Sequence, residues 1–107
     1  MIKKAETSAL TAAVQPVYHL RLYTAGDEPN SRMARENLEQ ICREELDGLC
    51  NIEEINVLVD YESALRDRIF VTPTLVLLKP EPRTIVVGNL GNRDKVVSAL
   101  HLGAGNG

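Results

Sequence analysis

The segment VTPTLVLL, at residues 71–78, contains the strongest strand signal in this sequence. Its second half, Leu75 to Leu78, is a continuous apolar run, which is typical of a strand buried on both faces of a sheet. A proline at position 73 fits the start of such a strand, because proline has no backbone N–H to donate to a neighbouring strand. The run therefore predicts an internal strand that other elements cover on both sides.

Upstream of this segment, the sequence predicts a strand followed by a long amphipathic helix. Apolar and polar side chains alternate over residues 18–23, which is the period of a strand. Apolar residues then recur at helical spacing up to Gly48, a natural helix stop. Asn30 or Ser31 is expected to cap the first turn, because their side chains accept hydrogen bonds from free backbone N–H groups.

A second strand and helix are expected between this helix and the internal strand. Apolar residues at every second position, Ile55, Val57 and Val59, predict the strand. Asp60 is suited to cap a short helix that runs to Ile69. The side chains of this helix expected to face inward are Ala64, Leu65 and Ile69.

Two further elements follow the internal strand. Residues 84–87 are mostly β-branched and predict another strand, and Asn92 is expected to cap a last helix. The order βαβαββα is that of the thioredoxin fold, so we expect one α/β domain with a mixed four-stranded sheet and helices on both faces. The domain is expected at residues 17–102, between flexible segments at residues 1–16 and 103–107.

Length, composition and charge restrict the classes of function. The chain has 107 residues, of which 44% are hydrophobic, enough for one core. Its 12 basic and 15 acidic residues give a net charge of −3, which argues against a nucleic-acid-binding protein, since these usually carry a basic face. No apolar run approaches the roughly 20 residues of a membrane span, and no signal-peptide pattern is present. We therefore expect a cytoplasmic protein that binds neither membranes nor nucleic acid.

The two cysteines, Cys42 and Cys50, lie eight positions apart. This spacing fits neither a CxxC redox pair nor a zinc site. We expect two reduced thiols, with Cys42 on the apolar face of the long helix.

The redox chemistry of thioredoxin-like proteins depends on two features. Residues 71–75 resemble the I-P-T-L-type segment of thioredoxins, so the bond before Pro73 is expected to be cis; the alternative is a trans proline that starts the strand. If Pro29 stands at the proline of a C-G-P-C motif, the two cysteine positions hold Asp27 and Asn30, which form neither a disulfide nor a thiolate. Dithiol oxidoreductase activity is excluded if this fold is correct.

The sequence indicates no other catalytic or cofactor site. His19 and His101 lie near opposite ends of the chain, and the acidic residues between positions 44 and 54 are typical of a solvated surface. Its glycines form no phosphate-binding motif. We therefore expect no enzyme, no cofactor and no metal.

Several motifs in register resemble the KaiB family of circadian clock proteins. The segment LYTAGDEPNS, at residues 22–31, is similar to the L-Y-V-A-G-x-x-P-N-S opening of that family. INV at 55–57, TPTL at 72–75 and VGNL at 87–90 resemble the later family motifs I-D-V, T-P-T-L and I-G-D-L. The resemblance covers about residues 17–102, nearly the whole expected domain.

This resemblance implies a non-enzymatic regulator that binds other proteins. KaiB-family proteins bind the ATPase ring of the hexameric KaiC and help to sequester KaiA and output kinases. We accordingly expect a KaiC-like hexameric ATPase as the partner, with a KaiA-like protein or an output histidine kinase as further partners. The candidate partner-binding residues are Gly26, Asn30, Arg32 and Arg35.

The family is also metamorphic: its tetrameric ground state refolds its C-terminal half into the thioredoxin-like arrangement that binds KaiC. Here Ala99 and His101 stand where the family typically has a glycine and an acidic residue, and both differences favour a C-terminal helix. We therefore expect the chain to rest in the thioredoxin-like state, as a monomer or small homo-oligomer. The residues assigned to the fold switch and its structural support are Pro73, Gly88, Asn89, Ala99 and His101.

Three alternatives compete with a role in a circadian oscillator. Clock members often carry basic residues where this chain has Met33, Leu77 and Thr84, so a role in stress adaptation is the first alternative. The second is a thioredoxin- or glutaredoxin-like redox protein. The third is an isolated KaiB-like sensor domain of a histidine kinase.

Overall fold

The computed structural model describes residues 17–105, which fold in the expected order βαβαββα. The helix α4 reaches Gly105, beyond residue 102 where the domain was expected to end. Residues 1–16 and 106–107 lie outside the described residues, so the expectations for them stay predictions. The elements are β1 (Tyr18–Thr24), α2 (Pro29–Glu45), β2 (Cys50–Asn56), α3 (Tyr61–Arg66), β3 (Thr74–Lys79), β4 (Thr84–Val87) and α4 (Arg93–Gly105).

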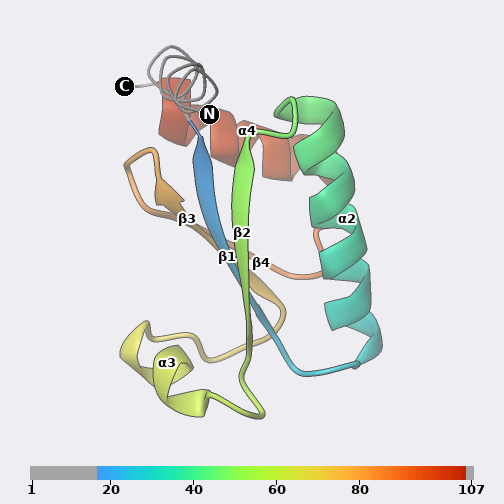
Figure 1. The fold of residues 1–107 in the computed structure, drawn as a ribbon, viewed down its shortest axis with the longest axis vertical. Helices are drawn as coiled ribbons and strands as arrows, with labels where there is room; N and C mark the ends of the chain where they lie inside the picture. The colour runs from blue at the N-terminus through green and yellow to red at the C-terminus, as the bar shows by residue number, and fades with distance from the viewer. Residues whose placement is uncertain (1–16, 106–107) are drawn as a thin grey trace, which may run out of the picture.

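The strands form one mixed sheet in the order β2-β1-β3-β4 (Figure 1). β1 pairs with β2 in parallel and with β3 antiparallel, and β4 closes an antiparallel hairpin with β3. Leu75, Val76 and Leu77 on β3 are at most 1% exposed, which confirms the internal strand predicted from its continuous apolar run. The bond between Thr72 and Pro73, just before this strand, is cis as expected.

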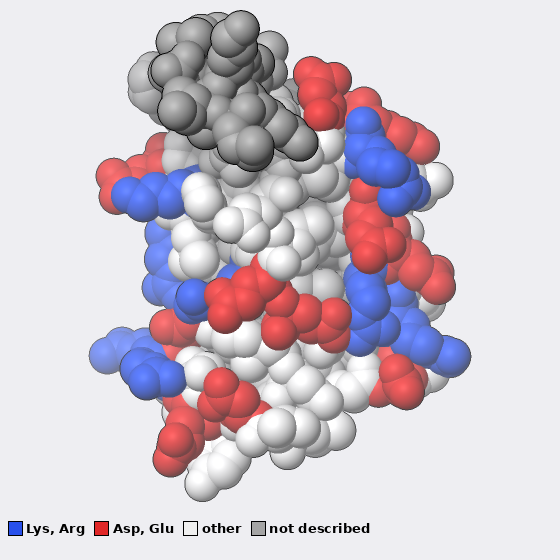
Figure 2. Space-filling model, in the orientation of Figure 1, with Lys and Arg blue, Asp and Glu red and all other residues white. Residues whose placement is uncertain are grey.

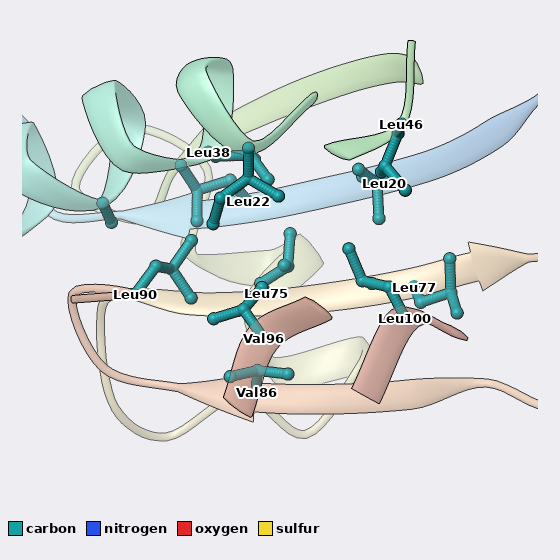
Figure 3. Packing of buried hydrophobic residues seen from close by; sticks show 12 residues of the cluster. Leu20, Leu22, Leu38, Leu46, Leu75, Leu77, Val86, Leu90, Val96 and Leu100 are labelled. Carbon is teal, nitrogen blue, oxygen red and sulfur yellow. The ribbon is translucent and has the colours of Figure 1, made fainter. Parts of the chain in front are cut away.

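The main core fills the space between the sheet and the helices α2 and α4 (Figure 3). Leucines of β1 and β3 point toward leucines of the two helices. Truncating one such leucine to alanine typically costs about 2–5 kcal/mol of stability. The buried residues of this cluster are Leu20, Leu22, Ala34, Leu38, Ile41, Leu46, Leu75, Leu77, Val86, Leu90, Val96 and Leu100.

A smaller core lies on the opposite face of the sheet, under α3. Tyr23 and Val76 are fully buried there against Ala64 and Ile69. Helices therefore cover both faces, as predicted, but α3 has only six residues and covers one end of its face.

The second strand begins five residues earlier than expected, because two of the three apolar residues used to predict it lie beyond its end. β2 spans Cys50–Asn56, so Val57 and Val59 follow the strand instead of lying in it, and Val59 is 81% exposed. The start of β2 is set by parallel pairing with β1, in which Cys50 lies opposite Tyr18. The strand is hard to recognise because four of its residues, from Asn51 to Glu54, are exposed.

Two helix expectations also need correction. Glu28, not Asn30 or Ser31, caps α2: its carboxylate accepts hydrogen bonds from the backbone N–H groups of both residues, and Pro29 occupies the first helical position. The helix α3 ends at Arg66 instead of Ile69, and Leu65 faces solvent with 58% of its surface exposed.

The remaining helix ends agree with the sequence. The side chain of Asp60 accepts a hydrogen bond from the N–H of Ser63 at the start of α3. Asn92 accepts one from the N–H of Lys95 at the start of α4. Gly48 follows α2 with a φ of 73° and donates its N–H to the carbonyl of Cys42, as a glycine stop does.

The expectation of two reduced thiols is wrong: Cys42 and Cys50 form a disulfide, with their Cα atoms 6.1 Å apart. The turn at residues 46–49 reverses the chain, so the last turn of α2 meets the first residue of β2. Eight residues of continuous helix would separate the two cysteines by about 12 Å, so they meet here because α2 ends between them. Within the described residues, no helix is long and apolar enough to cross a membrane.

Candidate protein-binding site

Four loops meet at one end of the sheet, where β1, β2 and β4 end and β3 begins (Figure 1). They comprise residues 25–31 (with the first turn of α2), 57–60, 71–73 and 88–92, and we call them the loop-end face. Of the nine residues singled out from the sequence, all but Ala99 and His101 lie on this face or next to it. Those two lie on α4, where Ala99 packs against the main core and His101 is exposed.

The turn after β1 depends on glycine and on a buried serine. Gly26 has a φ of 63°, and a Cβ atom there would lie 3.4 Å from Leu58, so a side chain at this position is strained. The hydroxyl of Ser31, which is fully buried, accepts a hydrogen bond from the N–H of Ala25 at 2.9 Å. The turn and the first turn of α2 therefore form one connected unit.

Arg35 ties this unit to the edge of the sheet. It contacts Glu54 on β2 at two points: Nε lies 2.8 Å from Oε1, and Nη2 lies 2.5 Å from Oε2. Nη2 also lies 3.4 Å from the carbonyl oxygen of Gly26. Thr24 donates a further hydrogen bond to Glu54. The Arg35 guanidinium is the main cause of a lowered pKa at Glu54. Arg35 is thus bound within the chain, whereas Arg32, also a candidate, is exposed.

Asparagines link the first turn of α2 to the loop after β4. The side chain of Asn89 donates to Oδ1 of Asn30 at 3.3 Å, and its backbone carbonyl accepts from Asn37 at 2.9 Å. The N–H of Gly88 donates to the carbonyl of Pro73 at 2.9 Å. Four predicted residues from three loops are therefore joined by hydrogen bonds.

Exposed apolar side chains extend the loop-end face around α3. Each is more than half exposed, and Leu58 lies against the Gly26 turn. Several of them line a hollow of about 250 Å³, whose inner side is formed by Ile69 and Ala64. Figure 2 shows broad uncharged areas at this lower end of the molecule. We call this surface the apolar tip: Leu58, Val59, Tyr61, Leu65, Phe70 and Val71.

A buried tyrosine holds the segment after α3 against the sheet. The hydroxyl of Tyr23 donates to Asp67, and Arg21 pairs with Asp67 at 3.0 Å and with Glu53 at 2.9 Å. The Tyr23 hydrogen bond is the main cause of a lowered pKa at Asp67, and burial raises the pKa of Tyr23. This network attaches the segment after α3, which carries part of the apolar tip, to the sheet.

Three groups of site residues were not found from the sequence. Glu54 and Asn37 act through partners 19 and 52 residues away, so no local pattern marks them. Ser31 was read as a helix cap, although its buried hydroxyl holds the Gly26 turn. The sequence did contain a signal for the apolar tip, since the apolar residues Phe70 and Val71 follow a helix and belong to no strand pattern. This signal was overlooked because Leu65 was expected to face inward.

Asp27 and Asn30 are exposed at the start of α2, on either side of the cap Glu28 and of Pro29. A carboxylate and an amide here supply hydrogen-bonding groups but no thiol chemistry. Among residues 17–105, no three side chains of metal-ligating type gather into a possible ion site.

Solved structures of known proteins place this architecture in a class. Over 92% of both chains, it is similar to the thioredoxin Deadhead of Drosophila melanogaster, with a TM-score of 0.65 at 14% identity. It is also similar to the N-terminal domain of SasA from Synechococcus elongatus, with a TM-score of 0.68 at 22% identity, over 79% of this chain and 80% of that one. The chain therefore has a thioredoxin-like fold.

Sequence comparison gives the family. The KaiB domain model matches residues 21–102. The chain is 38% identical to the circadian clock oscillator protein KaiB of Thermostichus vulcanus over 85% of this chain and 84% of that protein. It is 40% identical to the KaiB of Microcystis aeruginosa over 79% and 82% of the two chains. The chain belongs to the KaiB family of circadian clock proteins.

Proposed function

We propose that this chain is a non-enzymatic regulator that binds a KaiC-like hexameric ATPase through the loop-end face and the apolar tip. It acts in the cytoplasm, in rhythm control or in stress adaptation, with a KaiA-like protein or an output histidine kinase as further partners. The observation that carries the proposal is that exposed apolar side chains lie beside loops that hydrogen bonds join to one another. Contiguous exposed apolar surface of this kind marks protein-binding sites.

The contacts suggest separate roles for the candidate residues. Arg32 is exposed on the first turns of α2 and is free to pair with an acidic group of the partner. Phe70, 77% exposed, offers the largest apolar side chain of the tip. Arg35 and Gly26 act through the shape of the turn, and Asn30 and Asn89 hold two loops in place.

The resting state belongs to the same proposal. The C-terminal segment lies in the thioredoxin-like arrangement as the helix α4, with Val96 and Leu100 buried in the main core. We propose that the free protein rests in this state, as a monomer or small homo-oligomer. NMR of the free protein is the test, and a strand at residues 96–100 would contradict it.

The binding test uses a KaiC-type hexameric ATPase and biolayer interferometry in the presence of ATP or ADP. Arg32→Ala is expected to weaken binding about tenfold, and Phe70→Ser more, because central apolar anchors dominate interface energies. Arg43→Ala, also exposed on α2 but near its other end, is the matched control for the charge. Ile85→Ser, an exposed apolar residue on β4, is the control for Phe70.

Equal losses in the control variants would contradict a site at this end of the sheet. Failure of the unmodified protein to bind in either nucleotide would overturn the proposed function. Catalytic turnover in the reduction of insulin or glutathione disulfide by the chain would favour the redox alternative instead.

A further inference from the structure

The disulfide between Cys42 and Cys50 lies at the other end of α2 from the loop-end face. Cys42 is on the last turn of α2, and Cys50 is the first residue of β2. Their Cα separation of 6.1 Å lies within the usual range for a bridge, so both cysteines are already placed to pair without moving the backbone far. Nothing in the proposed partner binding uses this pair.

The main core cluster is built from residues other than the two cysteines, and Cys50 only packs against its border. As a thiol, Cys42 remains a small apolar side chain suited to its buried position. Reduction is therefore expected to leave the sheet and the helices in place.

The segment that the bridge closes is a tight turn with two successive residues in the left-handed region of backbone conformation. Asp47 and Gly48 both have positive φ values, 55° and 73°, and an aspartate in this region is strained. The N–H groups of Leu46 and Gly48 both donate to the carbonyl of Cys42, at 3.2 and 2.8 Å. A covalent link across this turn restricts its opening, and removal of the link releases it.

The two sulfurs differ in access. Cys42 is 7% exposed, whereas Cys50 is only partly buried at the start of an edge strand. A small thiol or disulfide in solution therefore reaches Cys50 first. Cys42 is then the thiol that resolves a mixed disulfide at Cys50.

We propose that Cys42 and Cys50 form a reversible thiol–disulfide site that exchanges with low-molecular-weight thiols of the glutathione class. For closure, the Cys50 thiolate attacks glutathione disulfide and releases one glutathione thiolate. Cys42 loses its proton, attacks the Cys50 sulfur of the mixed disulfide and releases the second glutathione. Two protein thiols are oxidised and one glutathione disulfide is reduced; opening is the reverse.

The reversible character rests on the cytoplasmic setting proposed above, where persistent disulfides are rare and those present are usually transient. The consequence is local: in the open state the turn at residues 46–49 loosens, while the loop-end face keeps its structure. The state of the bridge thus follows the ratio of reduced to oxidised thiols in the cell. Its opening changes the structure at residues 46–49 and leaves the loop-end face unchanged.

The test equilibrates the full chain with mixtures of reduced and oxidised glutathione and measures free thiols by alkylation and mass spectrometry. We expect a reversible transition in which the bridged form is lighter by two hydrogen atoms. Hydrogen exchange on the two end states is expected to show about tenfold faster exchange at Leu46 and Gly48 in the reduced form. The N–H of Gly88, bonded to Pro73 at the other end, is the internal control and is expected not to change.

Two single variants test the assigned roles of the sulfurs. Cys42→Ser is expected to accumulate a glutathione adduct on Cys50, because no second thiol resolves it. Cys50→Ser is expected to form little adduct, since Cys42 is buried.

The proposal is overturned if glutathione never opens the bridge, which would make it a fixed structural link, or never closes it. It is also overturned if adduct formation is equal in the two variants, or if Gly88 responds as strongly as Gly48. These measurements need no ATPase, so a failure to bind the partner leaves them unaffected and is recognised separately.

Discussion

The guanidinium group of Arg35 joins two segments that lie nineteen residues apart in the chain. Its two-point contact with Glu54 is the geometry in which arginine and carboxylate interact best. Both side chains are about one-third exposed, so solvent screens the pair and limits its contribution to stability. A residue first singled out as a partner contact is therefore also an internal support of the Gly26 turn.

For this pair, we expect Arg35→Ala and Glu54→Gln each to lower the free energy of unfolding by about 1 kcal/mol. The double variant is expected to lose less than the sum, because the second change removes a group that has already lost its partner. Urea denaturation of the four proteins measures this, with Glu36→Gln, also exposed on α2, as the control. Strict additivity would contradict the coupling.

Local signals predicted some residues correctly and concealed others. Gly48, Asp60 and Asn92 were found because turn and cap chemistry acts over a few neighbouring residues. The disulfide was missed, although both cysteines were noticed, because their meeting depends on where α2 ends and where β2 pairs with β1. Such long-range pairing leaves no trace in a sequence window.

At the scale of elements, strands with a continuous apolar or β-branched pattern were predicted better than the edge strand β2. An unbroken apolar run predicts β3, and β-branched residues predict β4. β2 presents polar side chains along most of its length, so its neighbour β1, not its own pattern, determines where it starts. The short helix α3 was placed correctly at its cap but extended too far, because Ile69 packs inward after the helix has already ended.

The helix α4 is the element on which the proposed resting state depends. Ala99→Gly is expected to destabilise the folded protein by about 1 kcal/mol, since glycine is a poorer helix former than alanine by that amount. Ser98→Gly, exposed on the same helix, is the matched control and is expected to cost about half as much.

Thermal denaturation gives the stabilities of the two α4 variants, and NMR shows whether either populates a second fold. New resonances in slow exchange for Ala99→Gly alone would show that this position controls the fold switch. If Ala99→Gly has no effect on stability, the helical preference argued for the C-terminal segment is wrong.

At the scale of the whole molecule, stability is expected to depend on pH through the carboxylates that hold the sheet to α2 and to the segment after α3. The pKa values of Glu54 and Asp67 are lowered in the folded protein by hydrogen bonds from Arg35 and Tyr23. A group with a lowered folded pKa contributes stability above its unfolded pKa, about 4, and loses it as the pH falls through the folded value. Unfolding should therefore become easier below about pH 4.

Urea midpoints measured between neutral and acidic pH test this, and Asp67→Asn is expected to flatten the profile. Tyr23 gives the opposite sign, because its raised pKa means that stability is lost as the pH rises through the folded value, above about 10. An acid profile that is unchanged in Asp67→Asn would show that other carboxylates determine it.

Because β2 lies at the edge of the sheet, it affects whether copies of this chain aggregate at high concentration. An exposed edge strand invites a further strand, and thereby aggregation, unless charges or short length discourage it. Here Glu53 and Glu54 project from opposite faces of β2, and each is engaged by an arginine of its own chain. A second copy that docked its own β2 there would have to accommodate these charged pairs on both faces, and the other edge, β4, offers only four residues. The ion pairs that stabilise the domain therefore also help to prevent a second copy from adding a strand to its sheet.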